Sequence, residues 1–184
     1  MSPDLIPVAV PRPAALVRDF VNTLDHELGT DELATPAGLT GFLMTHDLLD
    51  AGRADERHRQ QAVALRAGLR QALALNHEPH GSALVALDEV LAVLPVRLRW
   101  AEGGVVAAPA EPGVAGALAR IGLAAHESRA TEDWWRLKIC AFDECEWAYY
   151  DHSKNHSRAW CEYGCGNKVK TRAYRARKAA AASR

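Results

Sequence analysis

Four cysteines near the C-terminal end constrain the fold of this chain more than any other feature. They are the only cysteines among the 184 residues, and they form two close pairs, Cys140-x4-Cys145 and Cys161-x3-Cys165, separated by fifteen residues. Two close pairs can supply the four corners of a tetrahedral site, and thiolates are soft ligands that suit zinc. The pattern therefore predicts one structural Zn(II) ion held by Cys140, Cys145, Cys161 and Cys165.

Two histidines offer an alternative ligand set. His152 and His156 lie four positions apart between the cysteine pairs. A mixed site of Cys140, Cys145, His152 and Cys161 is conceivable, but it would leave Cys165 without a role, so we favour four cysteines and expect both histidines to be exposed. Two reversible disulfides are a further alternative. Four thiolates leave no open position for water, so the predicted site is structural and not catalytic.

The sequence predicts a cytoplasmic protein that is not bound to a membrane. Residues 1–10 have no basic stretch of the kind that opens a signal peptide. No apolar run approaches the roughly 20 residues that a membrane-spanning helix needs. In a reducing compartment, clustered cysteines favour metal binding over disulfides.

The net charge of −1 hides two regions of opposite charge. Residues 1–135 hold 11 Lys and Arg against 18 Asp and Glu, whereas residues 136–184 hold 11 against 5. A basic module on an acidic body favours a polyanionic partner, a nucleic acid. DNA is the preferred choice, and the charge pattern leaves RNA open. The candidate contacts are Arg158, Lys168, Lys170, Arg172, Arg175 and Arg177. The alternative is that these cations only keep a solvated tail in solution.

Three of these cations share one face of a predicted helix. The stretch from Lys168 to Ala182 is rich in alanine and basic residues, which predicts a helix. Lys168, Arg172 and Arg175 follow the i, i+4, i+7 spacing of one helical face.

Apolar periodicity predicts a mainly α N-terminal domain over residues 1–135. Helices are expected over 14–27, from Thr35-Pro36 onward, over 54–76, up to Val93, and after Pro112. A small β-hairpin is expected at about 96–108, where alternating residues flank a Gly-Gly turn. Residues 136–184 are expected to form a zinc-ribbon or treble-clef-like module with a hairpin of strands 147–151 and 158–161, followed by the basic helix.

The C-terminal residues resemble the CGNR zinc-finger family, named for a Cys-Gly-Asn-Arg motif. The matching residues are Cys140, Cys145, Trp147, Tyr149, Asp151, Ser153, Arg158, Trp160, Cys161, Cys165, Gly166 and Asn167. Lys168 stands where the family has arginine, which keeps the charge but loses the bidentate fork. The stretch Asp19-Phe-Val-Asn22-Thr23-Leu-Asp25 and the helix around Leu65-Arg66 are similar to the companion ABATE domain. The resemblance implies a stress-induced transcription regulator or an RNA-binding protein.

Four polar residues of the N-terminal region have two interpretations. Asp19, Asn22 and Thr23 lie within five positions of a stretch that is otherwise apolar. With Arg66 they could line a pocket for a small-molecule effector, or they could form an internal hydrogen-bond network, which we favour.

The sequence favours a nucleic-acid-binding regulator over two other classes. The alternative is a protein-interaction or ligand-sensing module whose zinc finger is purely structural. An enzyme is not expected, because we find no nucleophile–base arrangement, phosphate loop or open metal site. The sequence is also compatible with a homodimer and does not define the oligomeric state.

Overall fold

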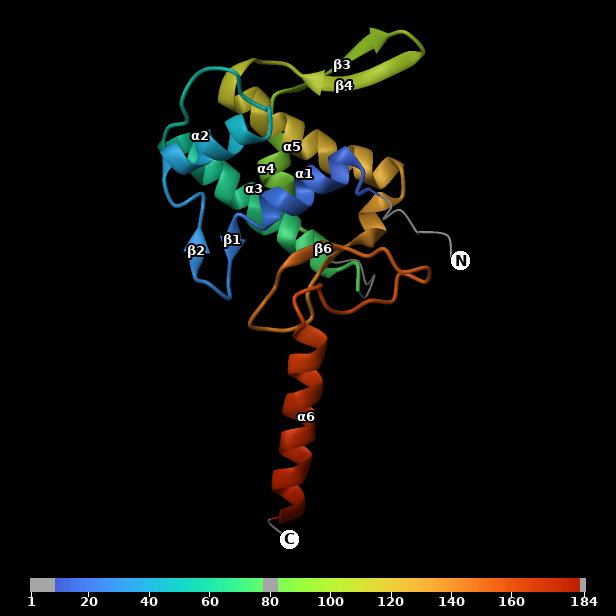
Figure 1. Ribbon diagram of the computed structural model, residues 1–184. Coiled ribbons are helices and arrows are strands. Elements are labelled where there is room, and N and C mark those ends of the chain that lie inside the picture. The colour runs from blue at the N-terminus through green and yellow to red at the C-terminus, as the bar shows by residue number, and fades with distance from the viewer. Residues whose placement is uncertain (1–8, 78–82, 183–184) are drawn as a thin grey trace, which may run out of the picture.

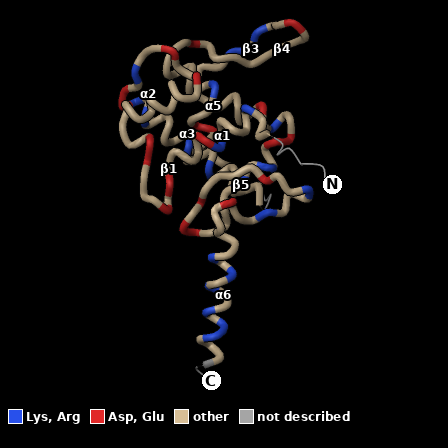
Figure 2. The backbone as a smooth tube through the Cα atoms, viewed as in Figure 1, with Lys and Arg blue, Asp and Glu red and all other residues tan. Residues whose placement is uncertain are grey.

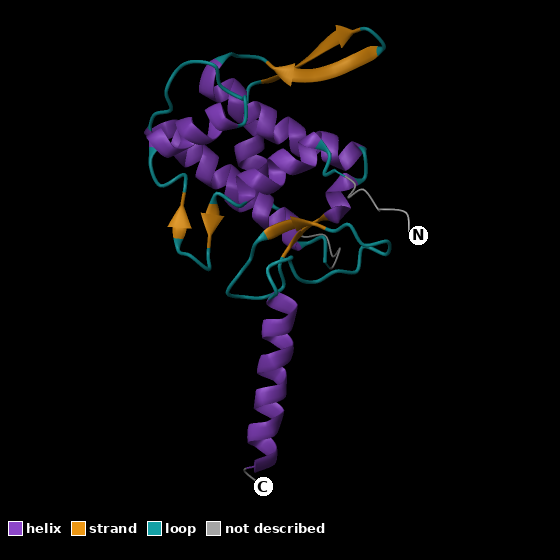
Figure 3. Ribbon diagram, viewed as in Figure 1, coloured by secondary structure: helices purple, strands orange, loops and turns teal. Residues whose placement is uncertain are grey.

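The computed structural model describes residues 9–77 and 83–182 and is mostly helical (Figures 1 and 3). The helices are α1 (Arg12–Val21), α2 (Pro36–Thr45), α3 (Glu56–Ala74), α4 (Val85–Ala92), α5 (Gly113–Ala130), the short 3-10 helix η1 (Asp133–Arg136) and α6 (Cys165–Ala182). The strands are β1 (Leu24–Asp25), β2 (Thr30–Asp31), β3 (Val96–Ala101), β4 (Gly104–Pro109), β5 (Leu137–Ile139) and β6 (Ala148–Tyr150). Consecutive strands pair in three antiparallel two-stranded sheets. The expected fold class, mainly α with small hairpins and a four-cysteine module, is confirmed.

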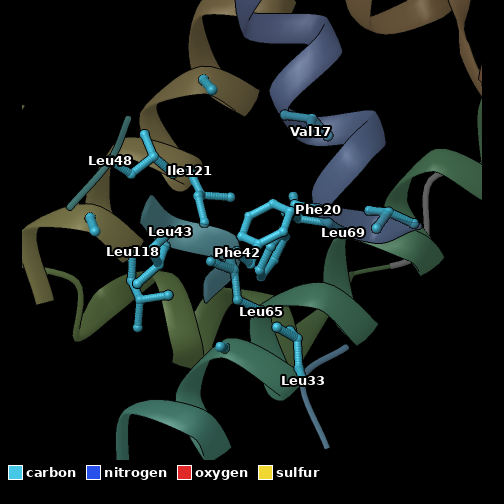
Figure 4. Close-up of a cluster of buried hydrophobic side chains, with 14 of the residues drawn as sticks. Val17, Phe20, Leu33, Phe42, Leu43, Leu48, Leu65, Leu69, Leu118 and Ile121 are labelled. Atoms are coloured by element: carbon cyan, nitrogen blue, oxygen red, sulfur yellow. The ribbon is translucent and has the colours of Figure 1, made fainter. Parts of the chain in front are cut away.

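An apolar core lies between α1, α2, α3 and α5. Figure 4 shows Phe20, Phe42, Leu65 and Ile121 converging from these four helices. The rings of Phe20 and Phe42 lie 5.6 Å apart between centroids, in a tilted arrangement. Each fully buried side chain of this size contributes about 1.5–3 kcal/mol of favourable free energy, so this cluster is a main source of stability in the helical body.

Local signals set the starts of two helices where the sequence indicated. The Thr35 side chain caps α2 by accepting a hydrogen bond from the Gly38 N–H at 3.1 Å. Asp55 caps α3 by accepting from the His58 N–H at 2.8 Å. Both interactions satisfy amide groups that a helix start leaves unpaired.

The first helix is shorter than expected. It was predicted over 14–27 but ends at Val21, and Asn22 and Thr23 follow its last turn. The Thr23 hydroxyl donates to the Phe20 carbonyl at 2.8 Å, and the Asn22 side chain pairs with the backbone of Ala148. These contacts direct the chain out of the helix and into the β1–β2 hairpin.

The expected hairpin near 96–108 is confirmed as β3 and β4. Gly103 and Gly104 have φ values of +93° and +146°, which only glycine adopts without strain. The hairpin extends away from the helices in Figure 1. Leu98 and Trp100 on it are 72% and 80% exposed.

The C-terminal region is attached to the core through β5 and β6. Leu137, Ile139, Ala148 and Tyr150 lie on one face of this sheet and belong to the main core cluster. The pairing corrects the predicted hairpin, because β6 pairs with β5 and residues 158–161 form no strand. Helix α6 projects from the far side of the sheet (Figure 1). The division at residue 135 stays a prediction.

Candidate metal centre and nucleic-acid interface

The four cysteines converge in space. Their sulfur atoms all lie within 4.8 Å of one another. The Cys145 Sγ is 3.7 Å from the Cys161 Sγ, which is 3.6 Å from the Cys165 Sγ. A disulfide needs about 2.05 Å, whereas four sulfurs at 2.3 Å from a tetrahedral ion lie about 3.8 Å apart. The geometry therefore fits a four-cysteine metal site and not two disulfides.

The first cysteine pair lies in the connection between β5 and β6. Cys140 follows β5 directly, and its N–H donates to the Trp147 carbonyl at 2.9 Å. Cys145 lies in a tight turn in which its N–H donates to the Phe142 carbonyl at 2.8 Å. The antiparallel strands thus hold both ends of this connection and bring the two sulfurs together.

The second pair frames the start of α6. Gly164, with φ of +79°, allows the sharp bend between Cys161 and the helix. Cys165 is the first residue of α6, where the positive end of the helix dipole favours a thiolate. The Cys161 N–H also donates to the Cys140 sulfur at 3.5 Å, which links the two pairs.

Burial makes the free thiols poor acids. It raises the pKa of Cys145 to about 12 and the pKa of Cys161 and Cys165 to about 11. At neutral pH these thiols are protonated unless a cation offsets the cost of a buried negative charge. Metal binding would therefore release protons and supply the charge that the pocket lacks.

The two histidines lie outside this cluster. His152 and His156 are exposed, and the His152 ring packs 4.9 Å from the Tyr150 ring. The cluster of possible metal ligands found over residues 9–77 and 83–182 consists of the four cysteines alone. The arrangement supports the ligand set preferred from the sequence over the mixed one.

A buried ion pair shapes the loop that leads to Cys161. The Lys138 Nζ lies 3.0 Å from the Asp151 carboxylate and also donates to the carbonyls of His156 and Arg158. Burial alone would raise the pKa of Asp151, but hydrogen bonds from Ser153, Lys138 and the Arg158 N–H together lower it to about 2. Lys138 is not among the residues predicted from the sequence; its position between two apolar residues, two residues before Cys140, is the signal that could have indicated it.

Three of the six predicted nucleic-acid contacts bind to the protein itself. Lys168 pairs with Glu27 at 2.6 Å, and Arg172 pairs with Glu144 at 2.8 Å. Arg158 donates to the Trp160 carbonyl and lies 3.4 Å from the Glu162 carboxylate. The face predicted from Lys168 and Arg172 is therefore directed partly toward an acid of the body, Glu27, and an acid of the module, Glu144.

The other three predicted contacts are exposed on α6. Lys170, Arg175 and Arg177 have no ion pair within the part of the chain that the structure describes, and the same holds for Lys178. Figure 2 shows basic residues along α6 and no acidic ones. Lys170, Arg177 and Lys178 follow i, i+7, i+8 spacing, which places them on one face with Tyr174, 60% exposed.

The four polar residues of the N-terminal region divide between two locations. The Arg66 side chain is only 5% exposed, because its guanidinium contacts the Asp31 carboxylate at 2.5 Å and the Thr23 hydroxyl at 3.1 Å. Hydrogen bonds with Arg66 and Leu33 also lower the pKa of Asp31 despite its partial burial. Asp19 instead pairs with Arg18, and together with Asn22 it lines a separate cavity.

Family comparisons agree with this anatomy. A model of the ABATE family, described as "Putative stress-induced transcription regulator", matches residues 14–132, and a model of the CGNR zinc finger matches residues 136–178. No curated protein matches the chain. None of the helices within 9–77 and 83–182 combines the length and apolarity required to cross a membrane.

Proposed function

This chain belongs to the ABATE family and carries a CGNR zinc finger, and on that premise we propose that it is a zinc-containing transcription regulator that binds DNA through α6. The observation that carries the proposal is the row of exposed cations on a helix that projects from the body and holds no acid. Such a helix can neutralise several phosphates at once.

Zinc is the ion that this ligand set suits best. Cys140, Cys145, Cys161 and Cys165 offer only sulfur, and four thiolates in tetrahedral arrangement are typical of structural zinc. When bound, the ion would supply structure and no chemistry, because no coordination position remains for water. The proposal is therefore of a binding protein and not an enzyme.

The proposed contacts are a refined set of the cations of α6. Lys170, Arg175, Arg177 and Lys178 are available for phosphates, whereas Lys168 and Arg172 are already paired with Glu27 and Glu144. The ion pairs at the base occupy two of the cations, and the exposed cations beyond them supply the proposed affinity for phosphates. DNA is proposed over RNA because a straight, exposed helix fits the major groove of B-form duplex.

Fluorescence anisotropy with a labelled DNA duplex, titrated between about 50 and 200 mM salt, tests the proposal. Four phosphate contacts predict a slope of log K against log salt of about −4. Replacing Lys170, Arg177 and Lys178 with Gln should lower its magnitude to about 1.

A matched variant controls for net charge. Replacing the exposed Arg53, Arg97 and Arg99 of the body with Gln removes the same charge and should leave the slope unchanged. An RNA duplex of the same sequence should bind more weakly. Absence of DNA binding at about 50 mM salt, or equal effects of the two triple variants, would contradict the proposal.

A protein-interaction function is the second candidate. The β3–β4 hairpin exposes Leu98 and Trp100, which lie on one face of a two-stranded sheet. An exposed apolar patch of this kind is typical of a protein contact. If this candidate is correct, replacing Leu98 and Trp100 with Ser abolishes binding of the protein partner while the affinity for DNA is unchanged.

A further inference from the structure

A cavity of about 450 Å³ lies where the helical body meets the four-cysteine module. Its walls come from α1 and α2 on one side, and from β6 and residues 161–163 on the other. The volume falls within the range of small-molecule sites, which occur preferentially at junctions between structural units. Both family-matched regions thus contribute to a single cavity.

Hydrogen bonds fix the floor of this cavity. The buried Asn22 side chain donates to the Ala148 carbonyl at 2.8 Å and accepts from the Ala148 N–H at 2.7 Å. The hydroxyl groups of Tyr149 and Tyr150 donate to the Arg158 carbonyl and the Asp133 carboxylate. The walls are therefore held in place before any ligand binds, which lowers the entropic cost of binding.

The side chains that line the cavity carry a negative balance. Three carboxylates, Asp19, Glu32 and Glu162, face one guanidinium, Arg18. Arg18 is already paired with Asp19 at 2.8 Å, and Glu162 lies 3.4 Å from the guanidinium of Arg158, which is not part of the lining. Within the described ranges the Glu32 carboxylate has no hydrogen bond or ion pair, so it is available to a ligand. This balance disfavours an anion and favours a cation.

Aromatic rings supply the second recognition element. Three ring pairs line the cavity: Phe42 with His46 at 4.3 Å, Tyr150 with His152 at 4.9 Å, and Trp147 edge-on to Tyr163 at 6.0 Å between centroids. Ring faces attract an organic cation that lies within about 6 Å of their centroids. Rings together with a free carboxylate are the chemistry that recognises an ammonium group.

We propose that this junction cavity binds a small organic cation, with the ammonium group against Glu32 and the rings of Trp147 and Tyr163. Cys161 also lines the cavity, so an occupant would contact the segment 161–163, which leads from the third cysteine of the metal site into α6. The site is thereby placed to report an effector from the helical body to the basic helix. Binding of the organic cation in this cavity does not require that α6 contact DNA.

Isothermal titration calorimetry on the full metal-loaded chain tests this assignment, with benzyltrimethylammonium as the probe and benzoate as its anionic counterpart. We expect saturable one-to-one binding of the cation and none of benzoate. Glu32→Gln should weaken binding about fivefold, and Trp147→Leu by a similar factor.

Glu89→Gln on α4 is the matched control, because it removes one exposed carboxylate that is not part of the cavity lining and should leave affinity unchanged. Glu32 is exposed, so Glu32→Gln should fold normally and keeps the test valid if Trp147→Leu does not fold. Binding of benzoate as tight as that of the cation, no saturable binding of the cation, or equal affinity in Glu32→Gln and the unmodified chain would overturn the assignment. DNA affinity, measured separately, distinguishes this failure from failure of the proposed function.

Discussion

The helical body and the four-cysteine module are stabilised by different physics. Of the 23 buried residues in the main core cluster of the described chain, 19 belong to the helical body and four, Leu137, Ile139, Ala148 and Tyr150, are supplied by β5 and β6. The second cluster contains six buried residues, and four of these are cysteines. The body is therefore expected to fold by apolar burial alone, whereas the module lacks enough apolar surface and depends on a metal.

The difference also explains the position of α6. The helix is exposed over most of its length, and Cys165 is its only fully buried residue within 165–181. An isolated helix of this length is marginal in water. The metal site therefore fixes the first turn of α6, and the rest of the helix extends from that anchor.

Loss of one metal ligand should have the largest effect. Cys161→Ser should remove most of the roughly 10–16 kcal/mol that zinc contributes in comparable peptides. Hydrogen exchange should show loss of amide protection over residues 151–182 and retained protection in α3. Equal protection of α6 in both proteins would contradict the comparison.

A substitution that creates a cavity in the main core should have the opposite effect: it should lower the stability of the helical body and leave metal binding unchanged. Leu69→Ala removes a buried side chain between α1 and α3 and should lower the free energy of unfolding by about 2–5 kcal/mol. A urea titration measures the loss, and metal analysis of the folded protein should give the same stoichiometry as before. The exposed Leu28→Ala is the control and should leave the urea midpoint unchanged.

The buried ion pair between Lys138 and Asp151 should contribute less to the free energy of unfolding, and it should do so only above acid pH. Asp151→Asn should lower stability by about 2 kcal/mol near neutral pH, from the depressed pKa of the carboxyl. Because the pKa in the folded state lies below its ordinary 3.8, this contribution is complete above about pH 4 and disappears as pH falls toward 2. Urea midpoints of both proteins should converge over that range, and a constant difference would argue against the ion pair.

The surface pair between α6 and the module should matter least. Glu144→Gln breaks the 2.8 Å contact with Arg172, but both side chains are more than half exposed. Pairs of this kind contribute little because water and salt screen them. The urea midpoint should not change measurably; a clear shift would mean that the helix base is held by charge as well as by metal.

Short-range signals in the sequence predicted much of this molecule. The cysteine spacing, the Thr35 cap and the Gly103-Gly104 turn each act over a few residues, so their consequences could be read directly. The pairing of β5 with β6 could not, because the short-range pattern of residues 158–161 also fits a strand that returns beside β6. That choice is decided by packing of Leu137 and Tyr150 on the body.

Long-range contacts account for the side-chain partners that the sequence did not reveal. Arg66 has no partner within its own helix, and its burial becomes acceptable only when Asp31 from β2 approaches it. Likewise, Lys168 and Arg172 match the helical spacing of a phosphate-binding face, but Glu27 and Glu144 occupy them in the fold. Spacing along one helix does not reveal which acids of another segment lie beside it.

Native mass spectrometry of the full chain, before and after chelation, tests the central claim most directly. We expect one zinc ion per chain, and we expect the chelator to remove it. Circular dichroism of the same samples should then show loss of the helical signal of α6, while the helical body stays folded. A chain that carries no metal, or whose mass shows two disulfides with α6 intact, would contradict it.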